Sequence, residues 1–260
     1  ADWKQWKLDE LYARPEDFFA ESLRKMAGQR TLGLNAVRAN PNLVGYGQPT
    51  SPLIHGEDST DKLLFMAEMA LPIVYQASPM MGGAAPVSMA AALALGNAEL
   101  LSGLVIHQLA RRGAPFVYGC GLHHMDMSSM QICYASPEFQ LTKAAVAQLG
   151  RKYGIPTWGY AGCSDAKVMD EQASLEAMLS VMMAKLTGAN LIHDVGYMES
   201  GLTTSYEMIV LTDELVAMSN HLMKGIDVTD ETLLVDELDR VGPGGNFLDS
   251  DATRARYRDF

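Results

Sequence analysis

The sequence predicts an α/β fold, a TIM-type (β/α)8 barrel that is partial or lacks an N-terminal portion. The first observation is a repeat: short β-rich runs begin at Pro72, Pro115, Pro156 and Asn190. Their spacing of 34 to 43 residues accommodates one strand, one loop and one helix each time. The second observation is that the segments between the runs are helical in composition. Short apolar strands that alternate with helices predict a parallel sheet covered by helices.

The chain is expected to have three parts: an N-terminal helical segment (1–40), a βα-barrel portion (41–248) and a C-terminal tail (249–260). Strands are expected at 43–47, 72–77, 115–121, 156–162 and 190–196. Helices are expected at 89–109, 141–152, 171–186 and 205–224. Ser136 before Pro137 suits the start of the second of these helices, and Gly225 suits the end of the last. Five strands are fewer than the eight of a closed barrel, so the sequence predicts part of one.

Composition argues against several classes of protein. The 260 residues are 48% hydrophobic and 20% charged, as in ordinary folded proteins, and the formal net charge is −11. Such an acidic chain is a poor partner for nucleic acid or for an anionic membrane surface. The three cysteines are too few and too widely spaced for a disulfide framework. The first residues do not resemble a signal peptide, and polar residues interrupt the apolar stretch 87–109, so we expect a cytoplasmic protein.

Nucleotide-binding motifs do not occur at the predicted strand ends. Neither GxGxxG nor GxxxxGK[ST] is present after a strand. The glycine-rich stretch 242–246 lies outside the strand–helix series and is interpreted as a turn.

Aromatic and acidic residues gather where the predicted strands end, which is where the working residues of a βα barrel lie. Tyr46, Tyr118, Tyr160 and Tyr197 each lie at or just after a strand end. A quaternary ammonium has no N–H to donate, so proteins hold it by aromatic faces and diffuse negative charge. Strands also favour Tyr and Trp for packing reasons alone, and this pattern leaves both interpretations open.

A metal site is the second candidate. Cys120, His123, His124 and Asp126 form a cluster with zinc-ligand chemistry, and His193 could complete a set from another strand. The spacing is not an established zinc signature, so polar loop residues beside a buried thiol remain the alternative. His193 and Asp194 of the same strand end also form a candidate acid–base pair.

Long motifs occur in a fixed order from about residue 40 to about residue 248. Residues 78–103 read SPMMGGAAPVSMAAALALGNAELLSG, and residues 164–179 read SDAKVMDEQASLEAML. Residues 189–218 read ANLIHDVGYMESGLTTSYEMIVLTDELVAM, and residues 225–233 and 241–248 read GIDVTDETL and VGPGGNFL. In these motifs the chain resembles the trimethylamine methyltransferase family.

The resemblance implies a TIM-barrel enzyme that moves a methyl group from a methylamine to the Co(I) centre of a separate corrinoid protein. Cobalamin would be carried by that partner, since no Asp-x-His-x-x-Gly pattern occurs here, and this chain would bind no cofactor or metal directly. Family members are typically longer, with a substantial portion before these motifs, in agreement with five predicted strands. The apolar helix at 89–109 leads us to expect a homo-oligomer.

The family members that give it its name carry pyrrolysine in the active site, and this sequence shows none. We expect the equivalent place in the loop Gly162-Cys163-Ser164. Members without pyrrolysine are associated with quaternary amines such as glycine betaine, and the resemblance implies that this chain belongs to that branch.

The predicted substrate-binding residues follow from their strand-end positions. We expect Tyr118, Tyr160 and Asp126 to contact the cation and His193 or Asp194 to orient it. No residue is assigned a catalytic role. Two alternatives stay open. One is a zinc-dependent barrel methyltransferase or hydrolase using Cys120, His123 and His193, and the other is a barrel that binds a betaine without catalysis.

Overall fold

The computed structural model describes residues 38, 39, 41 and 43–258. Residues 1–37, most of the predicted N-terminal helical segment, lie outside the described residues. Contacts divide the chain after Ser219 into two units, and each is described by itself. The predicted barrel portion (41–248) therefore includes residues 220–248, which belong to the second unit.

A five-stranded parallel sheet forms the centre of the first unit. Its spatial order is β1-β2-β3-β6-β7. The strands are β1 (Gly45–Gly47), β2 (Ile73–Ala77), β3 (Phe116–Cys120), β6 (Thr157–Tyr160) and β7 (Leu191–His193). All five lie inside the predicted runs, so the predicted strands and their parallel pairing are confirmed. The sheet is curled as half of a barrel, and a complete eight-stranded barrel is not present among the residues described.

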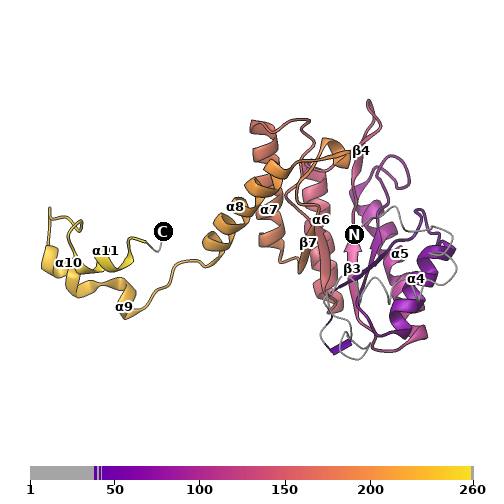
Figure 1. The fold of residues 1–260 in the computed structure, drawn as a ribbon, viewed down its shortest axis with the longest axis horizontal. Coiled ribbons are helices and arrows are strands. Elements are labelled where there is room, and N and C mark those ends of the chain that lie inside the picture. Colours follow the sequence, from indigo (N-terminus) through magenta and orange to yellow (C-terminus); the bar gives the residue numbers. More distant parts are fainter. Residues whose placement is uncertain (1–37, 40, 42, 259–260) are drawn as a thin grey trace, which may run out of the picture. The chain divides into compact units, whose positions relative to one another are not determined.

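Helices cover one face of this sheet (Figure 1). The helices that contact the strands are α4 (Glu57–Glu68), α5 (Met89–Ala110), α6 (Pro137–Tyr153) and α7 (Glu171–Thr187), and α8 (Tyr206–Met223) packs against α7. The last four confirm the predicted helices, whereas α4 was not predicted. Ser136 accepts a hydrogen bond from the Phe139 N–H and so caps α6 as expected. Because neighbouring strands are parallel, the segment between each pair of strands returns the chain to the same end of the sheet.

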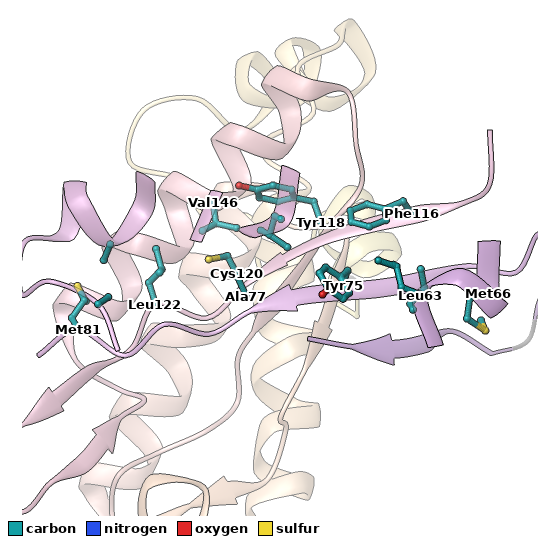
Figure 2. Close-up of a cluster of buried hydrophobic side chains, with 14 of the residues drawn as sticks. Leu63, Met66, Tyr75, Ala77, Met81, Phe116, Tyr118, Cys120, Leu122 and Val146 are labelled. Atoms are coloured by element: carbon teal, nitrogen blue, oxygen red, sulfur yellow. The ribbon is translucent and has the colours of Figure 1, made fainter. Parts of the chain in front are cut away.

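The core lies between the helices and the sheet (Figure 2). Tyr75 and Tyr118 are its largest fully buried side chains, and both come from strands. Helix α5 approaches β2 closely because Gly103 has no side chain: a Cβ there would come within 2.5 Å of Tyr75 Cδ1. This contact fixes α5 against the middle of the sheet.

Among the described residues, α5 is the one helix long and apolar enough to cross a membrane by length and composition. Its buried side nevertheless includes Glu99 and His107. Glu99 accepts hydrogen bonds from Ser51 Oγ and the Leu53 N–H, both at 2.8 Å. These two hydrogen bonds satisfy the buried carboxylate, as is usual for buried polar groups in folded proteins.

Two hairpins that the sequence did not predict follow the ends of β3 and β7. The first pairs β4 (His124–Asp126) with β5 (Gln131–Cys133), and the second pairs β8 (Tyr197–Met198) with β9 (Thr203–Thr204) across the 3-10 turn Glu199–Gly201. The second unit contains only short helices among its described residues. They are α9 (Asp230–Leu233), α10 (Val235–Val241) and α11 (Asp251–Arg256), the last of which lies in the predicted tail.

Candidate functional site

A cavity of about 750 Å³ lies at the carboxyl ends of the strands; we call it the strand-end cavity. Its lining includes Tyr46 of β1, Gln76 of β2, Trp158 of β6 and His193 of β7. Gly119 of β3 brings no side chain between Gln76 and Trp158, and a Cβ there would lie 3.3 Å from the Cβ atoms of both. This end of the strands is where α/β barrels place their working residues.

Strand alternation decides which side chains reach the cavity. Residues that pair across parallel strands share a face of the sheet. Gly119 pairs with Trp158, and Tyr160 pairs with His193, so these positions face the cavity side. Tyr118 pairs with Thr157 and therefore points to the other, helix-covered face.

Rings line the β6–β7 side of the cavity. The Trp158 ring stacks on the His193 imidazole, with centroids 4.5 Å apart and planes 27° apart, and the Tyr160 ring lies 4.3 Å from the same imidazole. Tyr134, between β5 and α6, lies 6.2 Å from Tyr160, and His123 packs against both at 4.8 and 5.4 Å. A cation held against such faces gains about 0.5 to 2 kcal/mol per contact.

Three tyrosines of the cavity lining are held in the neutral form. Desolvation raises the pKa of Tyr46, Tyr134 and Tyr160 above the usual value, and the charge of nearby Asp194 acts in the same direction. At neutral pH these residues therefore offer ring faces and hydroxyl groups to a ligand.

Asp194 is the one carboxylate among the described residues that line the cavity, and the same lining contains no Lys or Arg. Its side chain is 8% exposed, and Oδ1 lies 2.6 Å from His193 Nδ1. Its φ of +66° is left-handed, a conformation that Asp adopts more readily than most residues. The turn it makes directly after β7 places one anionic group beside an imidazole.

Three polar side chains, two of them buried and one partly buried, hold the rings of this side in place. Gln76 Nε2 donates to the Tyr160 hydroxyl and, at 3.1 Å, to Ser78 Oγ. From the helix side, Lys143 of α6 donates to the Tyr160 carbonyl at 2.9 Å, and burial lowers the pKa of its ammonium to about 8. Asp165 accepts from the Tyr134 N–H at 2.9 Å, and burial raises its pKa. The backbones of Tyr160 and Tyr134 are thus fixed from outside the cavity.

Three of the predicted substrate-binding residues, Tyr160, His193 and Asp194, come together in this cavity. Tyr118 does not. It is buried among the helix-facing side chains (Figure 2), and its hydroxyl donates to Asn97 Oδ1 at 2.8 Å. Tyr118 lies near the end of its strand, as predicted, but its side chain is on the face of the sheet opposite the cavity.

Asp126 also lies away from the strand-end cavity. It closes the turn of the β4–β5 hairpin, where its carboxylate accepts hydrogen bonds from Ser129 Oγ at 2.6 Å and from the Ser128 N–H at 3.1 Å. These bonds lower its pKa to about 2. The predicted cation contact by Asp126 is corrected accordingly, because an unpredicted hairpin carries it beyond the strand end.

The loop Gly162-Cys163-Ser164 follows β6 but is not part of the cavity lining. Burial raises the pKa of the Cys163 thiol to about 12, and Ser164 Oγ donates to Glu176 Oε2 at 2.5 Å. A Cβ at Gly162, whose φ is +70°, would lie 2.5 Å from Thr212 Cγ2. The equivalence of this loop to the pyrrolysine position stays a prediction.

The proposed zinc ligands do not converge. Cys120 lies in the helix-facing core, whereas His123 and His193 line the cavity. Within the described part of the chain, no group of three or more His, Cys, Asp or Glu residues is placed to hold a metal ion. Burial lowers the pKa of His123 to about 3, so its ring is neutral. The geometry does not support the zinc-dependent alternative.

Several lining residues were not among the predicted substrate-binding residues, although Tyr46 and Tyr197 belong to the aromatic pattern at the strand ends. The residues not predicted to bind substrate are Tyr46, Gln76, Tyr134, Trp158 and Tyr197. Counting two residues back from Tyr160 would have found Trp158, because alternate strand residues share a face. Tyr134 gave no such signal, since it follows an unpredicted hairpin.

Comparison with known proteins identifies relatives of this chain. The sequence profile of the family described as "Trimethylamine methyltransferase (MTTB)" matches residues 17–260. A trimethylamine methyltransferase of Desulfitobacterium hafniense (strain DCB-2) is 36% identical over 234 residues, which are 90% of this chain and 47% of that protein. A glycine betaine methyltransferase of D. hafniense (strain Y51) is 34% identical over 227 residues, 87% of this chain and 47% of that protein.

A trimethylamine methyltransferase of Methanosarcina barkeri (strain Fusaro) is 38% identical over 206 residues, 79% of this chain and 42% of that protein. The chain therefore spans about half the length of the curated relatives that it matches. The profile match covers the whole sheet, its helices and the strand-end cavity. On these grounds the chain belongs to the trimethylamine methyltransferase family.

Proposed function

We propose that the chain is a methyltransferase that moves a methyl group from a quaternary amine of the glycine betaine type, or from a methylamine, to the Co(I) centre of a cognate corrinoid protein. The observation that carries this proposal is the lining of the strand-end cavity. Its described residues combine aromatic faces with one carboxylate and no cationic side chain. The relatives' names, trimethylamine and glycine betaine methyltransferase, support a methylated amine as the ligand.

Aromatic faces suit this ligand because its charge is spread over methyl groups. Trp158, Tyr160 and Tyr134 would contact these groups, while Asp194 balances the charge. A quaternary nitrogen has no N–H, so its burial against rings leaves no donor unsatisfied. The site would therefore hold the cation without a covalent bond.

The partner's corrinoid supplies the Co(I) nucleophile that accepts the methyl group. The C–N bond breaks and its electron pair stays on nitrogen, so a quaternary amine leaves as a neutral tertiary amine and needs no proton. The residues of this chain orient one methyl group toward the acceptor and stabilise the positive charge of the amine until the C–N bond breaks. Tyr46 and Tyr197 are 44% and 37% exposed, so the cavity is open to solvent beside them.

The test is a methyl-transfer assay on the 260-residue chain with free cob(I)alamin as acceptor, under anaerobic conditions. We expect an amine-dependent loss of the Co(I) absorption and formation of the demethylated amine, detected by proton NMR. Asp194→Asn should reduce the rate, whereas Asp126→Asn, a carboxylate outside the cavity, should not. Saturable amine binding without any transfer, to cob(I)alamin or to a corrinoid protein, would refute the proposal and favour a binding protein.

A further inference from the structure

Buried polar atoms without partners gather in the strand-end cavity. Seven buried side-chain atoms in the described residues have no hydrogen-bond partner. Four belong to lining residues: Gln76 Oε1, His123 Nε2, Trp158 Nε1 and His193 Nε2. Gln76 and His123 are only 3% and 5% exposed. Buried polar groups in folded proteins are nearly always paired, so a cluster of unpaired ones indicates a polar ligand group.

Two of these four atoms, those of Gln76 and His123, are hydrogen-bond acceptors. The amide oxygen of Gln76 can only accept. His193 places Nδ1 2.6 Å from the Asp194 carboxylate, so Nδ1 is the donor in this contact, and Nε2 is left unpaired in the lining. Burial keeps His123 neutral by lowering its pKa to about 3, and an interaction with the Gly121 backbone opposes this shift. We assign the ring proton of His123 to Nδ1, the nitrogen that interacts with the Gly121 backbone, which leaves Nε2 as an acceptor.

The charged groups of the lining also disfavour an anionic ligand group. Asp194 supplies a negative charge, and no Lys or Arg is among the described lining residues. Lys143 is directed to the Tyr160 carbonyl and is not part of the lining. A ligand carboxylate in this cavity would lose its water without gaining a cation and would lie near the charge of Asp194.

We propose that the methylated amine bound in the strand-end cavity carries a hydroxyl group, as in a 2-hydroxyethyl-trimethylammonium compound, and that the site discriminates against a carboxylate at the same place. The hydroxyl donates to the acceptor of Gln76 or His123, while the rings and Asp194 hold the quaternary nitrogen. This proposal rests on the proposed function and narrows its substrate class.

Choline and glycine betaine form a matched pair for the test. Both have a trimethylammonium group and one methylene, and they differ in whether the next carbon carries a hydroxyl or a carboxylate. Isothermal titration of the 260-residue chain with choline, glycine betaine and tetramethylammonium gives the three dissociation constants. We expect choline to bind at least tenfold more tightly than glycine betaine, and more tightly than tetramethylammonium.

The charge argument has its own variant. Asp194→Asn removes the carboxylate, and Asn tolerates the left-handed φ at this position. The ratio of choline to glycine betaine affinity should fall at least threefold in this variant. Asp213→Asn, which removes an exposed carboxylate of α8, should leave the ratio unchanged. If Asp194→Asn binds neither compound, the ratio of choline to glycine betaine affinity in the unmodified chain decides whether the proposal holds.

The possible failures are distinguishable. A choline-to-betaine ratio below ten, or tetramethylammonium binding as tightly as choline, would overturn the hydroxyl preference and leave the proposed function standing. No saturable binding by any of the three cations would overturn the proposed function and this inference with it.

Discussion

Replacing Lys143 by Met should change the free energy of unfolding in a way that depends on pH. Lys143 is 9% exposed, and its ammonium donates to one carbonyl, that of Tyr160 at 2.9 Å. Burial lowers its pKa from the usual 10.5 to about 8. The charged form is therefore less favourable in the folded chain than in the unfolded one.

The size of the effect follows from these two pKa values. At pH 7 the difference corresponds to about 3 kcal/mol of lost stability. Between pH 8 and 10.5 the folded chain binds fewer protons than the unfolded chain, so the stability of the unmodified protein rises with pH through this window. Met avoids this cost but leaves the Tyr160 carbonyl without its partner, which costs about 1 to 3 kcal/mol at every pH.

Urea unfolding at pH 7 and pH 9.5 separates the two contributions. The free-energy advantage of Lys143→Met over the unmodified chain should shrink by about 2 kcal/mol between these pH values. Lys152→Met, on the exposed side of the same helix, is the control and should show no such change. A difference between Lys143→Met and the unmodified chain that is the same at both pH values would refute the assignment of a buried, charged lysine behind β6.

Three further outcomes are expected. Trp158→Leu should weaken tetramethylammonium binding about 2- to 30-fold in calorimetric titration because one ring face is lost, and unchanged affinity would rule out a ring contact. Gly103→Ala should lower the free energy of unfolding by about 1 to 3 kcal/mol, since the new methyl group would overlap the Tyr75 ring and the gain in helix propensity is only about 1 kcal/mol. Gly83→Ala is its control, because its Cβ would meet Met80 at an ordinary 3.6 Å. Asp126→Ala should leave amine affinity unchanged, and weaker binding would return this residue to the site.

The sheet could be predicted from the sequence because four of its five strands are short apolar runs opened by Pro or Asn, and a helix follows each strand before the next one begins. The site could be predicted only in part. Tyr118 comes three residues after Pro115 and Tyr160 four after Pro156, and this difference of one residue puts them on opposite faces of the sheet. A strand end marks the region of the site, whereas the pairing register determines which side chains enter it.

Irregular segments account for the rest of what sequence reasoning missed. Tyr134 reaches the cavity because Asp165, 31 residues later in the chain, holds its N–H at 2.9 Å. The same hairpin that precedes Tyr134 carries Asp126 away from the strand end. Neither placement follows from periodicity, because both depend on a tertiary contact made by a short loop.

Under the proposed function, two parts of the cavity lining would have separate roles. The rings of Trp158 and Tyr160 would contact the methylated nitrogen, which the proposed ligands have in common. The unpaired acceptors of Gln76 and His123 would contact the part of the ligand in which these amines differ. Relatives in this family are named for different methylated amines. Substitutions at Gln76 or His123 would change which polar group of the ligand is preferred and would leave the aromatic contacts to the nitrogen unchanged. We therefore expect substrate preference to depend more on the residues at the positions of Gln76 and His123 than on the number of aromatic rings in the lining.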